Sequence, residues 1–175
     1  VGSRWGANHC ISGPVLAIPY GKTGNYAYLL PETLKINGEL LPEQLHQGIF
    51  NVAVYNAKLQ LSGTFNSREL AASSDSLEWA KSVLLIGISD LHGIDNQVQM
   101  MWNGKSYLFN PGMVNNDLFL GSIQAPVSIA GGDSSALGGN FSLELCLKGS
   151  DRISFSPVAK TRGGGINSNW TGPCF

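Results

Sequence analysis

The side chains in this chain that are best suited to chemistry are those of Asp90 and His92. Residues two apart in a strand project to the same side, and carboxylate and imidazole groups are both metal ligands. A third ligand is not evident, because Asp95 lies in the same loop while His9 and His46 stand alone in the sequence. A structural zinc site normally has four spaced ligands, and a turn cap explains Asp90 equally well. The sequence therefore predicts no metal site and no cofactor-binding residue.

Serine, histidine and aspartate all occur, so the residue types of a hydrolytic triad are present. The Gly-x-Ser-x-Gly motif of many hydrolases is absent, and the three histidines are expected in three unrelated polar loops. A triad is recognised by its geometry, which these separate positions do not suggest. We therefore predict that the chain is not an enzyme, assign no catalytic residue, and keep a hydrolase only as the weakest of three hypotheses.

Cysteine and glycine patterns also give no active site. The three cysteines have no Cys-x-x-Cys spacing, which argues against a zinc or redox motif. Cys10 and Cys174 lie near the two chain ends, so a disulfide between them in an oxidising compartment and free cysteines are both left open. Residues 131–139 and 163–165 are rich in glycine, but neither run leads into the Lys-Ser/Thr of a phosphate-binding loop, and we expect flexible loops.

The composition excludes several classes of partner. Only 13% of the 175 residues are charged and the net charge is −1, so the chain has no basic surface for nucleic acid or for anionic lipid. Its longest apolar run is strand-sized, so residues 1–175 should not span a membrane. It has no initiator methionine and no signal peptide. We therefore expect residues 1–175 to be one domain excised from a longer protein.

The clearest structural signal is an alternation of apolar and polar residues over positions 48–65. From Tyr55 to Phe65 the apolar residues hold the odd positions, which predicts a strand with one wet face. Before Tyr55 they hold the even positions instead, so the pattern slips by one residue. A slip turns side chains to the opposite face, and we expect a β-bulge or a sheet-to-sheet corner at Tyr55. The residues to be buried are Phe50, Val52 and Val54 on one side of it and Leu59 and Leu61 on the other.

The remaining pattern predicts an all-β, mainly antiparallel fold. About ten short strands separated by glycine and proline favour a two-sheet β-sandwich, with one or two short helices around residues 68–81. Asn103-Gly104 predicts a hairpin turn.

Three further local features are expected from the same pattern. Asn37-Gly38 predicts a second hairpin turn, and residues 42–47 resemble a helical turn. Residues 141–147 alternate as a strand with one wet face, and residues 152–157 are expected to pair back onto it.

Five blocks of residues, taken in order, form a pattern that spans nearly the whole chain. The blocks are Trp5-Gly6 with Ser12-Gly13-Pro14-Val15-Leu16-Ala17-Ile18-Pro19-Tyr20, Leu30-Pro31-Glu32-Thr33-Leu34-Lys35-Ile36-Asn37-Gly38, the run from Gly48 to Phe65, Ile88-Ser89-Asp90-Leu91-His92-Gly93-Ile94, and Asn167-Ser168-Asn169-Trp170 with Pro173 and Phe175. Together they resemble the extracytoplasmic region of the CreD family of inner membrane proteins. His92 departs from the pattern, since the family usually has a basic residue there.

The resemblance implies an inner membrane protein of a Gram-negative bacterium whose periplasmic domain is this chain. An anchor would precede Val1 and membrane helices would follow the domain. The family is associated with an envelope-stress response under a two-component system, and no reaction is established for it, so no catalytic, cofactor or metal residue is carried over. The family's region also continues beyond Phe175. A strand edge left unpaired by that missing segment would favour self-association.

Two non-enzymatic hypotheses therefore stand ahead of the hydrolase. The first is an interaction or sensing module for an unknown envelope protein. The second is a sandwich that binds an envelope lipid or glycan, with a small apolar ligand between the sheets. A cavity lined by the odd positions from Tyr55 to Phe65 would favour the second hypothesis. A packed interior with an exposed apolar or open-edged patch would favour the first.

Overall fold

The computed structural model consists almost entirely of strands. It describes residues 6–22, 24–66, 68, 76–94, 97–111, 119, 121–129, 138–156 and 161–168. Within these ranges, no helix is long or apolar enough to cross a membrane. The elements are β1 (Gly6–Tyr20), β2 (Asn25–Leu29), β3 (Thr33–Gln47), β4 (Phe50–Asn66), the 3-10 turn η1 (Trp79–Lys81), β5 (Ser82–Ile88), β6 (Gln99–Trp102), β7 (Lys105–Leu108), β8 (Asn110–Pro111), β9 (Ser122–Val127), β10 (Gly138–Ser156) and β11 (Thr161–Ser168).

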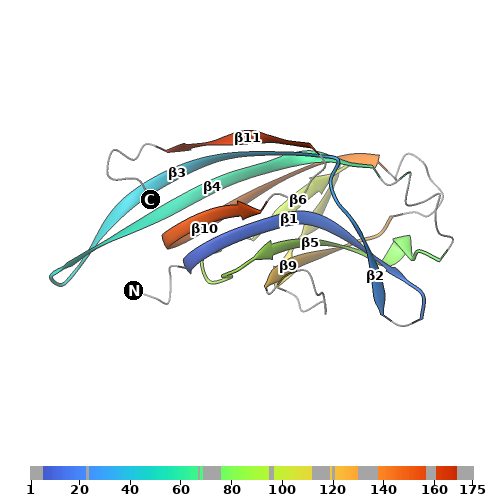
Figure 1. Ribbon diagram of the computed structural model, residues 1–175, viewed down its shortest axis with the longest axis horizontal. Coiled ribbons are helices and arrows are strands. Elements are labelled where there is room, and N and C mark those ends of the chain that lie inside the picture. Colours follow the sequence, from blue (N-terminus) through green and yellow to red (C-terminus); the bar gives the residue numbers. More distant parts are fainter. Residues whose placement is uncertain are drawn as a thin grey trace.

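The strands form one hydrogen-bonded network that folds over into two packed layers (Figure 1). The order β11-β3-β4-β10 makes one layer and β1-β5-β9-β8 makes the other, while β2 pairs with β1 and β6 pairs with both β10 and β7. Within the described strands, only the β1–β10 and β11–β3 pairings are parallel. The predicted sandwich of mainly antiparallel strands is therefore confirmed.

Strand β10 belongs to both layers. Residues 138–149 pair with β4, and residues 149–156 pair with β1, so the strand carries the chain from one layer into the other (Figure 1). The predicted pairing of residues 152–157 with 141–147 is wrong, and Pro157 itself lies outside the described residues. The physical reason is that β4 occupies one edge of residues 141–144 and β6 occupies the other, which leaves no edge for a hairpin partner.

The odd positions of β4 fill the space between the layers. They are buried in one apolar cluster with side chains from β1, β5, β6, β9 and β10. The ring of Phe65 lies 5.4 Å from that of Trp102 and 5.1 Å from that of Phe141, between ring centroids. The prediction that Leu59 and Leu61 are buried is confirmed, since each is 1% exposed. Buried β4 residues on the odd phase are Tyr55, Ala57, Leu59, Leu61 and Phe65.

Strand β3 runs without a break through two places where the sequence predicted otherwise. Asn37 pairs with Gln60 and Gly38 with Leu59, so Asn37-Gly38 is not a turn. Residues 42–47 continue the strand and form no helical turn. Pairing with β4 along the whole of β3 outweighs the local turn preference, and the chain reverses instead at Gly48, whose φ is +62°.

The slip at Val54-Tyr55 contains neither a bulge nor a corner. The register between β3 and β4 is continuous from Gln47 and Phe50 to Thr33 and Thr64. What changes at this point is which face of β4 carries the apolar side chains. The cause is that the part of the β3–β4 hairpin near its turn extends beyond the sandwich. Val54 is buried as predicted, but Val52 is only half-buried and Phe50 is 68% exposed, so the predicted burial of these two residues is wrong.

Three shorter predictions have mixed outcomes. The Asn103-Gly104 turn is confirmed, since it joins β6 to β7 with φ values of 48° and 79°. Of the expected helices, the structure describes η1, while residues 67 and 69–75 lie outside the described residues. Residues 163–165 are not a loop but part of β11, because β3 offers a parallel partner along residues 33–40. Of the other glycine-rich run, residues 131–137 lie outside the described residues.

Candidate functional site

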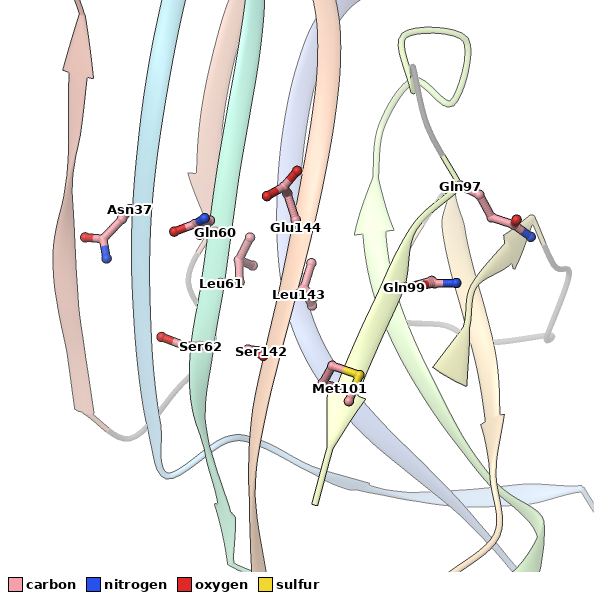
Figure 2. Close-up of a pocket in the computed structure, with 10 residues that line it drawn as sticks. All are labelled: Asn37, Gln60, Leu61, Ser62, Gln97, Gln99, Met101, Ser142, Leu143 and Glu144. Carbon is pink, nitrogen blue, oxygen red and sulfur yellow. The ribbon is translucent and has the colours of Figure 1, made fainter. Parts of the chain in front are cut away.

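An open groove of about 550 Å³ lies on the outer face of β3, β4, β10 and β6. Polar side chains from adjacent strands line up across it (Figure 2). Strand register explains the alignment, because Asn37 pairs with Gln60, Gln60 with Glu144, and Glu144 with Gln99. With neighbouring strands about 4.8 Å apart, these four residues, the amide row, extend over about 14 Å.

A second line of side chains lies beside the amide row. Ser142 pairs with Ser62 on one side and with Met101 on the other. Met101 is 46% exposed and supplies an apolar surface next to the two hydroxyl groups. Glu144 Oε1 lies 3.5 Å from Lys58 Nζ, and both side chains are about half exposed, so this ion pair adds little stability.

The chemistry of the groove is recognition by neutral hydrogen-bonding groups. Amides offer both donors and acceptors, and serine hydroxyls offer both as well. Glu144 is the one carboxylate in the lining that the structure describes, so no pair of carboxylates is present there for acid–base catalysis. The groove fits a ligand rich in hydroxyl or amide groups. It lies on the face that the alternation of residues 55–65 predicted to be wet, but the sequence did not show which strands would lie beside it.

His9 has a very different environment from the polar loop predicted for it. It lies in β1 and is 1% exposed, because β1 begins at Gly6 and pairs with the last part of β10. Its Nδ1 lies 3.0 Å from the hydroxyl oxygen of Tyr55, which itself donates to the carbonyl oxygen of Arg152 at 2.9 Å. The Tyr55 proton is used in this way, so the hydroxyl oxygen can accept from Nδ1 of His9 in the tautomer that carries the proton on that atom.

Burial lowers the pKa of His9 from its usual value of 6.5, and the nearby Asp90 carboxylate and backbone carbonyl only partly offset this effect. Nε2 is buried and has no hydrogen-bond partner in the part of the chain described. The ring packs against Gly93, where any Cβ would overlap Nε2 and the carbonyl oxygen of Lys148. His9 is therefore held neutral at pH 7, and it joins β1 to β4 and to the loop that contains Asp90.

Asp90 and His92 form a side-chain pair in which Asp90 is half-buried and His92 is exposed. The Asp90 Oδ1 atom accepts from the backbone N–H of His92 and lies 2.9 Å from its ring Nδ1, which is the turn-cap geometry considered from the sequence. Among the residues described, no group of three or more His, Cys, Asp or Glu is arranged to hold a metal ion, and Asp95 lies outside them. His46 is exposed on β3, whereas His9 and His92 both lie near Asp90.

Of the cysteines, Cys10 is exposed and free, whereas Cys146 is half-buried with its Sγ atom 3.9 Å from Glu144 Oε1. Cys174 lies outside the described residues, so the structure does not test the Cys10–Cys174 disulfide.

The second conspicuous surface is the far part of the β3–β4 hairpin, residues 42–55, which we call the arm. Within the described strands, β11 pairs with β3 only as far as Leu40, and β10 pairs with β4 only from Tyr55 onward. The arm is therefore a two-stranded ribbon that projects from the sandwich (Figure 1). At about 3.4 Å per residue it extends about 17 Å beyond Tyr55. Its tip is apolar, since Ile49 is 92% exposed and Phe50 is 68% exposed.

Comparison with known proteins gives one consistent result. The family described as "Inner membrane protein CreD" matches residues 1–175. Inner membrane protein CreD of Escherichia coli (strain K12) is 24% identical over 178 residues, which cover 93% of this chain and 39% of that protein. The chain thus spans about two fifths of the length of this curated relative. No solved structure matches it. Because the family match covers every residue, the chain belongs to the CreD family of inner membrane proteins.

Proposed function

We propose that the chain is a non-enzymatic interaction or sensing module in a CreD-family inner membrane protein, located in the periplasm of a Gram-negative bacterium and acting in the envelope-stress response. The inner-membrane character is that of the family to which the chain belongs. Periplasmic placement and the role in stress follow the family resemblance.

One combination of features carries the interaction role: a packed interior together with a projecting apolar arm. The odd positions of β4, which would have lined an internal apolar site, are in contact with buried side chains of the opposite layer. Apolar surface is presented outside instead, at Ile49 and Phe50 on the arm tip. Exposed apolar groups on a narrow projection are costly in water unless a partner covers them. The arm is therefore the contact surface of the proposed module.

The hydrolase hypothesis has less support. It needs a serine or aspartate within hydrogen-bond reach of a histidine in a cleft. The buried His9 contacts a tyrosine, and neither Asp90 nor His92 is among the residues that line the groove.

Site-specific photocrosslinking in the full-length protein tests the interaction role. A benzophenone amino acid replaces Ile49 at the arm tip or, as a matched control, the 42% exposed Leu108 on β7. In envelopes under cell-wall stress, we expect the probe at position 49 to form a specific adduct with an envelope component and the probe at position 108 to form none. The interaction proposal fails if the two positions give the same background.

A second candidate function is binding of an envelope glycan in the groove. It is favoured by the amide row and the adjacent serines, which match a ligand with many hydroxyl groups. Titration with a soluble chito-oligosaccharide, followed by NMR of side-chain amides, tests it. We expect shifts at Gln60 and Gln99 that are lost in Gln60→Ala, while Asn25→Ala, outside the groove, behaves as wild type. Unchanged amide signals at saturating sugar would rule out this ligand class.

A further inference from the structure

The arm tip has the chemistry of a membrane-inserting element. Ile49 and Phe50 are adjacent at the turn, and both are mostly exposed. The polar residues Gln47 and Asn51 flank them, so the apolar surface is confined to the end of the ribbon. A short aliphatic and aromatic end with polar flanks suits the boundary between headgroups and acyl chains.

The distribution of charge along the arm agrees with this location. Glu43 is the one carboxylate of residues 42–55, and it pairs in register with Val54. Glu43 lies four positions before Gln47, which pairs with Phe50, so Glu43 is about 13 Å behind the tip. Interfacial elements bury their apolar groups about 5–10 Å deep, so the carboxylate would stay in water. The arm has no lysine or arginine, and its contact would not require anionic lipid.

The orientation of the domain also brings the tip toward a bilayer. Gly6 at the start of β1 pairs with Gly149, which pairs with Tyr55 at the base of the arm. Ser168 at the end of β11 pairs with Leu40, beside the same base. Both ends of the described chain therefore lie at the side of the sandwich from which the arm projects (Figure 1). In a family of inner membrane proteins, linkage to the membrane through either of these described ends would bring that side toward the bilayer.

From these three observations we propose that the arm docks on the lipid bilayer by inserting Ile49 and Phe50 into its interfacial region. This proposal deepens the proposed function, because it names the partner of the same contact surface. Two side chains bind a membrane only weakly by themselves. Attachment of the domain to the membrane raises their effective concentration, so a weak contact is sufficient.

The test reproduces that attachment. The 175-residue chain with an N-terminal histidine tag is bound to phosphatidylcholine vesicles that contain a nickel-chelating lipid and acyl-brominated phosphatidylcholine. A tryptophan introduced by Phe50→Trp reports the depth of the tip through quenching by bromine. Leu108→Trp is the matched control, since Leu108 is also exposed but pairs with Gln99, far from the arm in register. We expect most of the added fluorescence at position 50, and none of that at position 108, to be quenched.

A second substitution separates insertion from mere proximity. Ile49→Ser in the Phe50→Trp chain should lower the ratio of inserted to withdrawn tip about tenfold or more, because burial of an aliphatic side chain is lost. High salt should change nothing. Both substituted residues are exposed, so the urea midpoint should match the parent chain and exclude misfolding.

Four results would overturn bilayer docking. Equal quenching at positions 50 and 108 would contradict insertion. So would quenching at position 50 that Ile49→Ser leaves unchanged. Sedimentation without vesicles could reveal a dimer that Ile49→Ser abolishes. That result would identify a second copy of the chain as the partner of the arm tip. Finally, a protein adduct and no lipid adduct from the probe at position 49 would refute the bilayer as partner while leaving the interaction role intact.

Discussion

The hydroxyl oxygen of Tyr55 lies 3.0 Å from Nδ1 of His9, and this contact joins β4 of one layer to β1 of the other. The same hydroxyl donates to the carbonyl oxygen of Arg152 in the part of β10 that pairs with β1. Tyr55 also stands directly opposite Gly149, where any Cβ would overlap its ring and hydroxyl group. The base of the arm is thus fixed by a buried polar contact that depends on one glycine.

Replacement of Tyr55 by phenylalanine should destabilise the fold by about 1–3 kcal/mol, because it removes the partner of the buried His9 Nδ1 atom and a donor to the carbonyl oxygen of Arg152. Urea unfolding followed by tryptophan fluorescence measures the change. Tyr107→Phe, at a half-buried position on β7, is the control and should have a much smaller effect. Equal midpoints for Tyr55→Phe and the wild type would show that the hydroxyl contact contributes no stability.

The lowered pKa of His9 predicts that acid destabilises the folded state. The unfolded chain takes up a proton on this residue near pH 6.5, whereas the folded chain does so only at lower pH. Since the unfolded state then binds more protons, the free energy of unfolding falls as the pH drops below about 6.5, and His9 has no influence well above that pH.

Urea midpoints at pH 7.5, 6.5 and 5.5 for the wild type and His9→Asn check this sign. Asparagine keeps a donor near the Tyr55 hydroxyl but does not titrate, so the variant should lose less stability on acidification. If the wild type and His9→Asn lose stability equally as the pH falls, the acid destabilisation comes from other titratable groups.

Gly93→Ala should destabilise by about 1–3 kcal/mol, because overpacking forces His9 or the carbonyl of Lys148 to move. Gly138→Ala is a suitable comparison, since a Cβ there would lie 3.5 Å from the carbonyl oxygen of Phe65, an ordinary contact. Thermal unfolding of both variants gives the difference. If Gly93→Ala and Gly138→Ala have the same melting temperature, the ring of His9 does not pack against the loop in solution.

Leu59→Ala should cost about 2–4 kcal/mol, because the residue is 1% exposed and its removal leaves a cavity between the layers. Lys58→Ala, at the neighbouring exposed position, should change the urea midpoint little. The m-value should stay constant for both, as expected when only the folded state's packing changes. A larger loss for Lys58→Ala would mean that the strand's two faces had been assigned the wrong way round.

Sequence patterns predicted the features that depend on local periodicity. The odd positions from Tyr55 to Phe65 are buried, and residues 141–147 alternate in the same way. The Asn103-Gly104 turn was also predicted, because both residues adopt the positive φ that a two-residue hairpin requires. Asn37-Gly38 has the same two residue types but forms no turn, since pairing of β3 with β4 along its full length outweighs the turn preference.

Features that depend on distant contacts were not predictable in the same way. His9 is brought to Tyr55 by the pairing of β1 with β10, and nothing in the residues around His9 signals that neighbour. The amide row likewise requires the order β3-β4-β10-β6, which single-strand patterns do not contain. The slip before Tyr55 was a real signal with a different cause, namely the end of the sandwich and the start of the arm.

The pairing of Gly6 with Gly149 also determines when the domain can fold. Strand β1 is made first during synthesis, but its partner in β10 emerges only after most of the described chain. Contacts so far apart in sequence slow folding because a long loop must close before they form. At about 5–20 residues per second, β1 would wait about 7–29 seconds with an unpaired edge. Nascent chains of this domain should therefore need protection of that edge until β10 arrives.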